Sequence, residues 1–154
     1  RKDSRLSRIL HALIHLKFLK RAVTSEELGQ MLSTNPVVVR RTMALLKQSG
    51  YVTSVKGHSG GWSLNKCLSE ITLYDIYKLV GESSVFTIGL TDEHQNCAVE
   101  KAVNRSLAEV LDEAEALMLK RFQEITIQSL AADFSKEIAT KPSLTMASQN
   151  GMND

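Results

Sequence analysis

Residues 36–64, PVVVRRTMALLKQSGYVTSVKGHSGGWSL, change from a helical to an extended pattern at Gly50. Within 36–48 the apolar residues recur at helical spacing, and a proline stands at the first helical position, where it is well tolerated. From Tyr51 onward β-branched and aromatic residues dominate, and the glycine-rich turn 57–61 separates two extended arms. The stretch therefore predicts a helix followed by a two-stranded hairpin.

Two helices are predicted before this stretch. Residues 5–20 place apolar side chains close to i, i+3, i+4, i+7 spacing. Thr24 and Glu27 have capping-box spacing, which opens a short second helix. Helix, helix, helix, hairpin is the order of a winged helix-turn-helix. We therefore predict a mainly α protein, with a DNA-binding winged-helix domain over 1–66 formed by three helices and a two-stranded wing.

The rest of the chain predicts a connection and a long helix. Residues 67–96 contain a helix capped by Thr72 and then a loop without a sustained period. From Cys97 to about residue 122 there is neither Gly nor Pro, and the apolar positions follow heptad spacing. Such a helix is hard to bury in one subunit, so a partner helix is favoured over packing within the chain. The expected dimer interface is Val103, Leu107, Val110, Leu111, Ala114, Leu117 and Met118.

A short C-terminal helix completes the expected dimerisation region, 97–134. Residues 135–154 turn to Ser, Thr, Asn, Gln and Lys, which predicts a disordered tail.

The net charge of +2 conceals a polarised chain. Residues 1–66 carry 12 Lys and Arg against 3 Asp and Glu, a net charge of +9, and the remaining residues carry −7. A basic half of this kind is expected to bind a polyanion, and the acidic half is expected to avoid one. Double-stranded DNA is the predicted partner of the winged-helix domain.

The spacing of 36–48 turns Val39, Met43 and Leu46 toward the core, so that the arginines face outward. Arginine in a major groove bridges guanine O6 and N7 or binds phosphate. Valines can contact thymine methyl groups, hydroxyls at a helix N-terminus can meet phosphate, and wing glycines allow close backbone approach. The predicted DNA contacts are Thr24, Ser25, Pro36, Val37, Val38, Arg40, Arg41, Lys47, Lys56, His58, Ser59, Gly60 and Gly61. Trp62 is expected to anchor the hairpin on its own domain.

The segments Leu46-Lys-Gln-Ser-Gly-Tyr-Val52 and Lys56-Gly-His-Ser-Gly-Gly-Trp-Ser-Leu64 resemble the Rrf2 family of bacterial transcription regulators. In that family the first motif ends the recognition helix and the second forms the wing. The resemblance covers roughly residues 5–130. It implies a homodimer that binds a near-palindromic operator, usually as a repressor, with Arg40, Arg41 and the wing on DNA.

The cysteines depart from the family pattern. Many members carry three cysteines in the loop and at the start of the long helix, and only Cys97 matches, in place of the first. A cluster needs three or four ligands, so we expect no iron–sulfur cluster and no other cofactor, as in a cluster-free branch. Cys97 at a helix N-terminus could instead serve a thiol-based redox sensor, with Cys67 or across a dimer. The alternative is a partly buried, inert side chain.

The sequence contains no motif that indicates metal binding or enzyme activity. His11 and His15 lie four residues apart but have no third ligand in reach by sequence, so no metal site is expected. There is no P-loop, G-x-S-x-G, H-E-x-x-H or dinucleotide-binding glycine pattern, which argues against an enzyme. Short apolar runs and two cysteines predict a cytoplasmic protein without a membrane span. The alternative that the winged helix binds only proteins is not excluded by the sequence. The sequence also does not identify the effector, which is either a redox signal or a small molecule.

Overall fold

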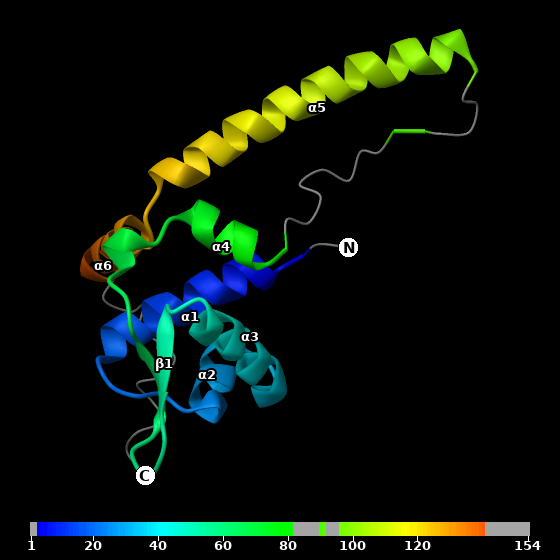
Figure 1. Cartoon of the computed structure of the whole chain (residues 1–154). Helices are drawn as coiled ribbons and strands as arrows, with labels where there is room; N and C mark the ends of the chain where they lie inside the picture. The colour runs from blue at the N-terminus through cyan, green and yellow to red at the C-terminus, as the bar shows by residue number, and fades with distance from the viewer. Residues whose placement is uncertain (1–2, 82–89, 92–95, 141–154) are drawn as a thin grey trace.

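The computed structural model describes residues 3–81, 90–91 and 96–140, and the side chains of these residues up to 136. The elements in order are α1 (Arg5–Leu19), α2 (Ser25–Met31), α3 (Pro36–Gln48), β1 (Val52–Val55), β2 (Gly61–Leu64), the 3-10 helix η1 (Leu68–Glu70), α4 (Leu73–Leu79), α5 (Ala98–Glu124) and α6 (Ile127–Thr140). The mainly α, winged helix-turn-helix prediction is confirmed. Figure 1 shows α1 to α3 and the hairpin as one body, from which α5 extends.

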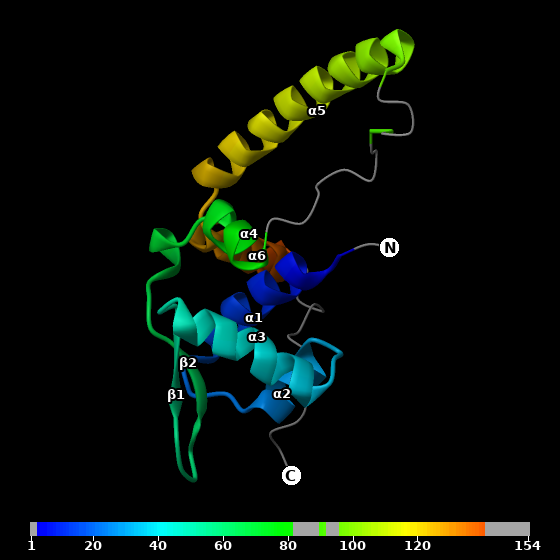
Figure 2. The same cartoon turned by 45° about the vertical axis from the view of Figure 1, so that its right-hand side comes forward.

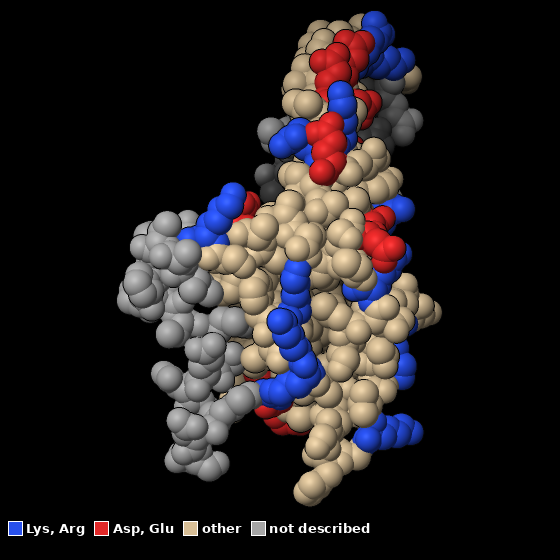
Figure 3. All heavy atoms as spheres, turned by 90° about the vertical axis from the view of Figure 1, so that its left-hand side faces the viewer, with Lys and Arg blue, Asp and Glu red and all other residues tan. Residues whose placement is uncertain are grey.

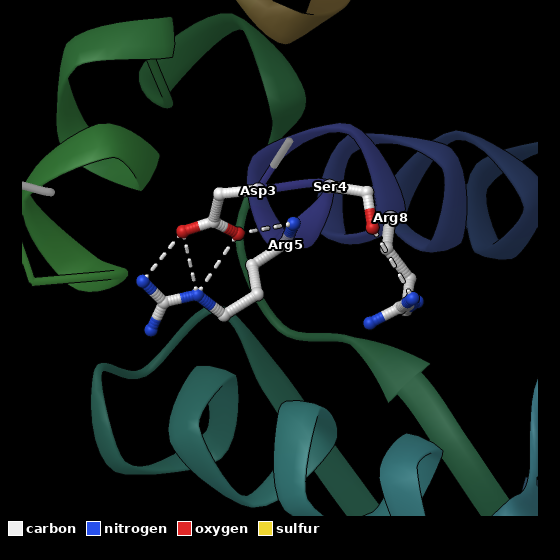
Figure 4. A network of polar contacts seen from close by, with 4 residues as sticks. All are labelled: Asp3, Ser4, Arg5 and Arg8. Carbon is white, nitrogen blue, oxygen red and sulfur yellow. Dashed lines mark hydrogen bonds and ion pairs between the residues drawn. The ribbon is translucent and has the colours of Figure 1, made fainter. Parts of the chain in front are cut away.

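The start of α1 is fixed by a carboxylate outside the helix (Figure 4). Asp3 Oδ1 accepts a hydrogen bond from the backbone N–H of Arg5 at 3.0 Å, and the Arg5 guanidinium pairs with the same carboxylate at 2.6 Å. Arg8 Nη2 donates to Ser4 Oγ at 3.4 Å. A negative group at a helix N-terminus accepts a hydrogen bond from an otherwise unpaired N–H and interacts favourably with the positive end of the helix dipole, so it stabilises the helix.

The predicted capping box of α2 is present. Thr24 Oγ1 accepts from the Glu27 N–H at 3.1 Å, and Glu27 Oε2 accepts from the Thr24 N–H at 2.9 Å. Burial raises the pKa of Glu27, but hydrogen bonds from Thr24 and pairing with Arg21 outweigh that effect and lower the pKa overall. The Glu27 carboxylate therefore stays charged and holds the turn between α1 and α2.

The core lies between the three helices and the hairpin. Val39, Met43 and Leu46 of α3 are buried, as their spacing predicted, and pack in one cluster with Leu13 of α1 and Leu28 of α2. The opposite face of α3 is left in solvent.

The wing is a short antiparallel hairpin in which Val52 pairs with Leu64 and Val55 with Gly61. Strand β1 is shorter than the predicted extended segment 51–56, and β2 begins at Gly61, inside the predicted turn 57–61. A single bridge extends the sheet on the β2 side: Val23 and Trp62 exchange two backbone hydrogen bonds of 2.9 and 2.8 Å. The wing is thereby tied to the segment between α1 and α2.

The C-terminal end of α5 is joined to the winged-helix domain by backbone pairing. The Leu73 N–H donates to the Ile125 carbonyl at 3.0 Å, and the Ile127 N–H donates to the Ile71 carbonyl at 2.9 Å. These bonds flank a bridge between Thr72 and Thr126. The C-terminal end of α5 is thereby fixed to the segment that precedes α4.

Helix α6 then packs back on the winged-helix domain, where Phe134 meets Phe18 of α1 edge-on with ring centroids 5.0 Å apart. It continues to Thr140. The prediction that a disordered tail begins at residue 135 is therefore wrong for 135–140. The predicted tail residues 141–154 lie outside the described residues, as does most of the predicted loop 82–96.

Helix α5 is 27 residues long and has no buried residue. Figure 2 shows that its N-terminal half stands clear of the body. Within the described part of the chain, no helix is both long and apolar enough to cross a membrane.

Candidate nucleic-acid interface

The exposed face of α3 carries the basic side chains that the sequence predicted. Arg40, Arg41 and Lys47 are all exposed, and Val37 at the start of the helix is 48% exposed. Val38 is half-buried. The face is therefore a basic strip with an exposed methyl-bearing side chain at its N-terminal end.

The two adjacent arginines have different surroundings. Arg40 Nη2 pairs with Glu26 Oε1 of α2 at 2.8 Å, and both side chains are largely exposed. Arg41 has no ion pair or hydrogen bond with any other described residue. Arg40 is thus held toward α2, whereas Arg41 is free to bind a ligand.

The wing lies beside this face. Lys47 Nζ donates to Ser54 Oγ of β1 at 2.8 Å, which connects the end of α3 with the hairpin. Lys56, His58 and Ser59 are exposed around the turn. The recognition face and the wing therefore form one continuous surface.

Trp62 anchors the wing, as predicted. Its indole Nε1–H donates to Ser25 Oγ at 3.0 Å, from β2 across to the first residue of α2. Ser25 is only 8% exposed. The Ser25 hydroxyl therefore anchors the wing and is not counted among the candidate DNA contacts. The sequence did not indicate this hydrogen bond because its two partners are 37 residues apart. Thr24 is half-buried, and its hydroxyl is used by the capping box.

The wing glycines were predicted to allow close approach of the backbone to DNA. The structure gives a different reason for glycine at two of these positions. Gly61 has φ +143, and a Cβ added there would lie 2.5 Å from the carbonyl carbon and oxygen of Val23. A Cβ at Gly60 would lie 2.4 Å from the Val55 carbonyl oxygen. Both positions need glycine for the hairpin to close on itself and on the domain.

Pro36 starts α3 and is half-buried, behind Asn35, whose side chain accepts from the Val37 N–H at 2.8 Å. It borders an open hollow of about 570 Å3 between α2 and α3, lined by Glu26, Gly29, Gln30, Ser33, Thr34, Asn35 and Pro36.

The charges follow the predicted division between the two halves of the chain. Figure 3, which views the side of the molecule on which α1 ends, shows Lys and Arg side chains over the winged-helix body, and both acidic and basic side chains on α5 above it. A polyanion would meet the basic body and be repelled by the acidic residues of the projecting helix.

The cysteines do not come together within one protomer. Cys97 precedes α5, which is about 40 Å long at ~1.5 Å per residue. Cys67 precedes η1, near the opposite end of α5. A disulfide needs Cα atoms within about 7 Å. The structure therefore gives no support to the option of a Cys67–Cys97 disulfide within one subunit, and both thiols are exposed in the protomer.

Cys67 has a feature that the sequence did not indicate. Hydrogen bonding to Ser69, 3.1 Å away, lowers the pKa of the Cys67 thiol and outweighs the opposing effects of burial and of the Glu70 charge. The two histidines on α1 are close, with Nε2 atoms 2.9 Å apart. Among the described residues, however, no three His, Cys, Asp or Glu side chains gather to hold a metal.

A three-helix body with an exposed basic third helix and an adjoining wing defines a winged helix-turn-helix DNA-binding protein. A family model described as Rrf2, iron-dependent transcriptional regulator, matches residues 3–133. The candidate HTH-type transcriptional regulator YwnA of Bacillus subtilis (strain 168) is 30% identical over 116 residues, which are 75% of this chain and 86% of that protein. The chain belongs to the Rrf2 family, and it is a transcriptional regulator rather than an enzyme.

Solved structures share the fold. A candidate transcriptional regulator from Lactobacillus plantarum has a TM-score of 0.72 at 24% identity, covering 86% of this chain and 90% of that chain. IscR from T. potens has a TM-score of 0.61 at 18% identity, with 86% and 87% covered.

The iron in the family description does not fit the donors of this chain. An iron–sulfur cluster takes about four ligands, mainly cysteines. The chain has two cysteines, and they lie near opposite ends of α5. One protomer cannot bring both to one cluster.

Proposed function

We propose that this regulator binds a near-palindromic operator as a homodimer, with α3 of each protomer in a major groove and the wing beside it along the backbone or minor groove. The observation that carries the proposal is the continuous surface formed by Arg40, Arg41 and Lys47 with the wing tip, in a half of the chain with a net charge of +9. Phosphate contacts from such a surface supply affinity, and side chains that reach base edges supply specificity.

Arg41 is the proposed base-reading arginine. It is exposed and unpaired among the described residues, so its guanidinium can form both hydrogen bonds to guanine without breaking an existing contact. Arg40 must first break its ion pair with Glu26. Breaking an exposed ion pair costs only about 0.2–1 kcal/mol, so Arg40 can still bind a phosphate. Val37 is placed to contact a thymine methyl group.

The dimer contact is proposed on α5. Five apolar side chains along it are strongly exposed: Val99, Val103, Leu107, Val110 and Leu117, at 71%, 49%, 38%, 63% and 65%. Leu111, Ala114 and Met118 are half-buried beside them. A row of this length normally packs on a partner helix. A two-fold dimer through α5 would place two recognition helices about 34 Å apart, one turn of DNA.

Repression is the proposed outcome, because a dimer covering an operator within a promoter blocks polymerase. The test is selection of binding sites from random DNA, followed by in vitro transcription from a promoter that carries the selected site. Selection of a palindrome together with reduced transcription supports the proposal. Increased transcription from the same template contradicts the repressor assignment and leaves the operator assignment standing.

Regulation without a cluster is part of the proposal, since the cysteine positions do not provide a ligand set. Protein purified without oxygen should show no cluster absorbance, and chelators should leave DNA affinity unchanged. A stoichiometric cluster in that preparation would contradict it.

A thiol-based redox switch is the second candidate, favoured by the exposed Cys67 thiol with its lowered pKa. Diamide added together with glutathione, which forms a mixed disulfide with an accessible thiolate, should then change DNA affinity; Cys67→Ser should abolish the change while Cys97→Ser preserves it. Equal affinity before and after oxidation excludes this candidate.

A further inference from the structure

A basic pocket lies on the side of the wing away from α3. It has a volume of about 320 Å3 and lies between the C-terminal end of α1 and strand β2, lined by Leu16, Lys17, Lys20, Arg21, Ser63 and Leu64. This volume is near the lower end of the range for small-molecule pockets, roughly 300–1,000 Å3. Two leucines provide an apolar wall, and three cations and one hydroxyl provide hydrogen-bond donors.

The charge of the pocket favours an anion. Three cations line it, and one of them, Arg21, pairs with Oε1 of Glu27 at 3.1 Å. The C-terminus of α1 adds a partial charge of roughly −0.5. Among the described residues named here, the cations outnumber the single carboxylate. Lys17 lines the pocket and also donates a hydrogen bond to Gln128 of α6.

Lys20 has a backbone conformation that lysine rarely adopts. It is the C-cap of α1 with φ +52, in the left-handed region, where glycine is the usual residue. A side chain with a Cβ is disfavoured in this region because the Cβ comes too close to the following carbonyl oxygen. Lys20 nevertheless lines the pocket from this position, so its side chain adds a positive charge to the pocket wall.

The pocket does not share the proposed DNA surface. Ser63 and Leu64 belong to β2, which packs beside α1, whereas α3 packs beside β1. Figure 3 views the side of the molecule on which α1 ends, where Lys and Arg side chains form a row. An occupant of the pocket would nonetheless touch the strand that contains Trp62, the anchor of the wing to α2.

We propose that this pocket binds a small molecule through a phosphate group and that its occupancy alters the position of the wing. Lys17, Lys20 and Arg21 contact the phosphate oxygens, Ser63 donates a hydrogen bond, and the leucines cover the apolar part of the molecule. Neither the binding step nor the effect on the wing depends on the proposed operator function; only a consequence for DNA affinity would rest on it.

The test is a titration of the full chain with pyrophosphate, without DNA and at constant ionic strength, followed by amide NMR. We expect saturable shifts centred on Lys20, Arg21, Ser63 and Leu64. Lys20→Gly relieves the positive φ and so should fold at least as well, yet it should weaken binding about tenfold through the loss of one charged hydrogen bond. Lys20→Arg should retain binding. Lys66→Gln, which alters a lysine over the Tyr51 ring outside the pocket, should match the wild type.

Shifts that do not saturate, that centre on Arg40 and Arg41, or that persist unchanged in Lys20→Gly would overturn the proposal. A DNA titration across salt supplies the second arm. Lys20→Gly should leave the log–log salt slope unchanged, because a slope smaller by about 1 would mean that Lys20 binds a DNA phosphate instead. If the chain binds pyrophosphate as described but no DNA, the operator proposal fails and the pocket assignment stands.

Discussion

Arg40 and Arg41 show how adjacent residues of one type acquire different roles. Both point away from the core because Val39 and Met43 are buried. One helical step separates them, and it brings Arg40 within 2.8 Å of Glu26 while Arg41 faces open solvent. The sequence could assign both to the exposed face, but the pairing of Arg40 depends on how α2 and α3 pack.

We predict that Arg41→Ala weakens specific operator binding by about 1–3 kcal/mol and relaxes the preference at one base pair. Arg40→Ala should weaken binding more evenly across sequences. Glu26→Gln is the matched variant at the ion pair: it frees Arg40 and removes a negative charge near the DNA, so affinity should rise. Gel-shift titrations on the selected operator and on single-base variants measure all three, and an unchanged affinity for Arg41→Ala would refute its role.

His15 is the residue whose protonation should affect stability. It is 6% exposed, and its Nδ1 has no hydrogen-bond partner among the described residues. Burial, and then the charge of His11, lower the pKa of His15 from 6.5 to about 4. The unfolded chain therefore binds a proton between pH 6.5 and 4 that the folded chain does not bind, so the free energy of unfolding falls as the pH falls through this window.

The expected loss from His15 is about 2 kcal/mol between pH 7 and pH 5, measured by urea unfolding at the two values. His15→Leu removes the titrating group while keeping an apolar side chain at the buried site. That variant should show a loss smaller by about this amount. An identical pH dependence in both proteins would mean that His15 is not the source.

At the level of elements, the sequence predicted the helix ends that are set by residues close together in the chain. Both ends of α3 match the prediction because Asn35 and Pro36 start it and Gly50, with φ +82, follows its end. The capping box of α2 also lies within four residues. The contact of Trp62 with Ser25 joins residues far apart in the chain, and α6 extends past 134 while Phe134 packs on Phe18. No local pattern contains those contacts.

The wing anchor can be tested by a double-mutant cycle. Trp62→Phe keeps a ring in place but removes the N–H that Ser25 accepts, and Ser25→Ala removes the acceptor. Each should reduce the free energy of unfolding by about 1–3 kcal/mol, because a buried polar group loses its partner. The double variant should lose less than the sum of the two. Strict additivity in urea unfolding would show that the hydrogen bond contributes nothing.

For the whole molecule, the projecting α5 is the proposed contact with a partner copy. Val110→Glu places a charge on the exposed apolar row, so we predict that it converts a dimer to a 17.1 kDa monomer in size-exclusion chromatography with light scattering. Glu113→Gln, also on α5 but outside the row, should remain a dimer. Helix content by circular dichroism should be unchanged in both. A monomeric wild type, or a Val110→Glu variant that stays dimeric, would contradict the interface.

The most direct test of the central claim is DNA binding by the wild-type chain over a salt series, measured by fluorescence anisotropy on sequences selected from random DNA. We predict a palindrome with half-sites about one helical turn apart and a log–log slope that corresponds to ~6–10 phosphate contacts. The Arg41→Ala variant should keep most of that slope and lose the sequence preference. Absence of binding at low salt would contradict the account and would indicate a winged helix that binds proteins instead.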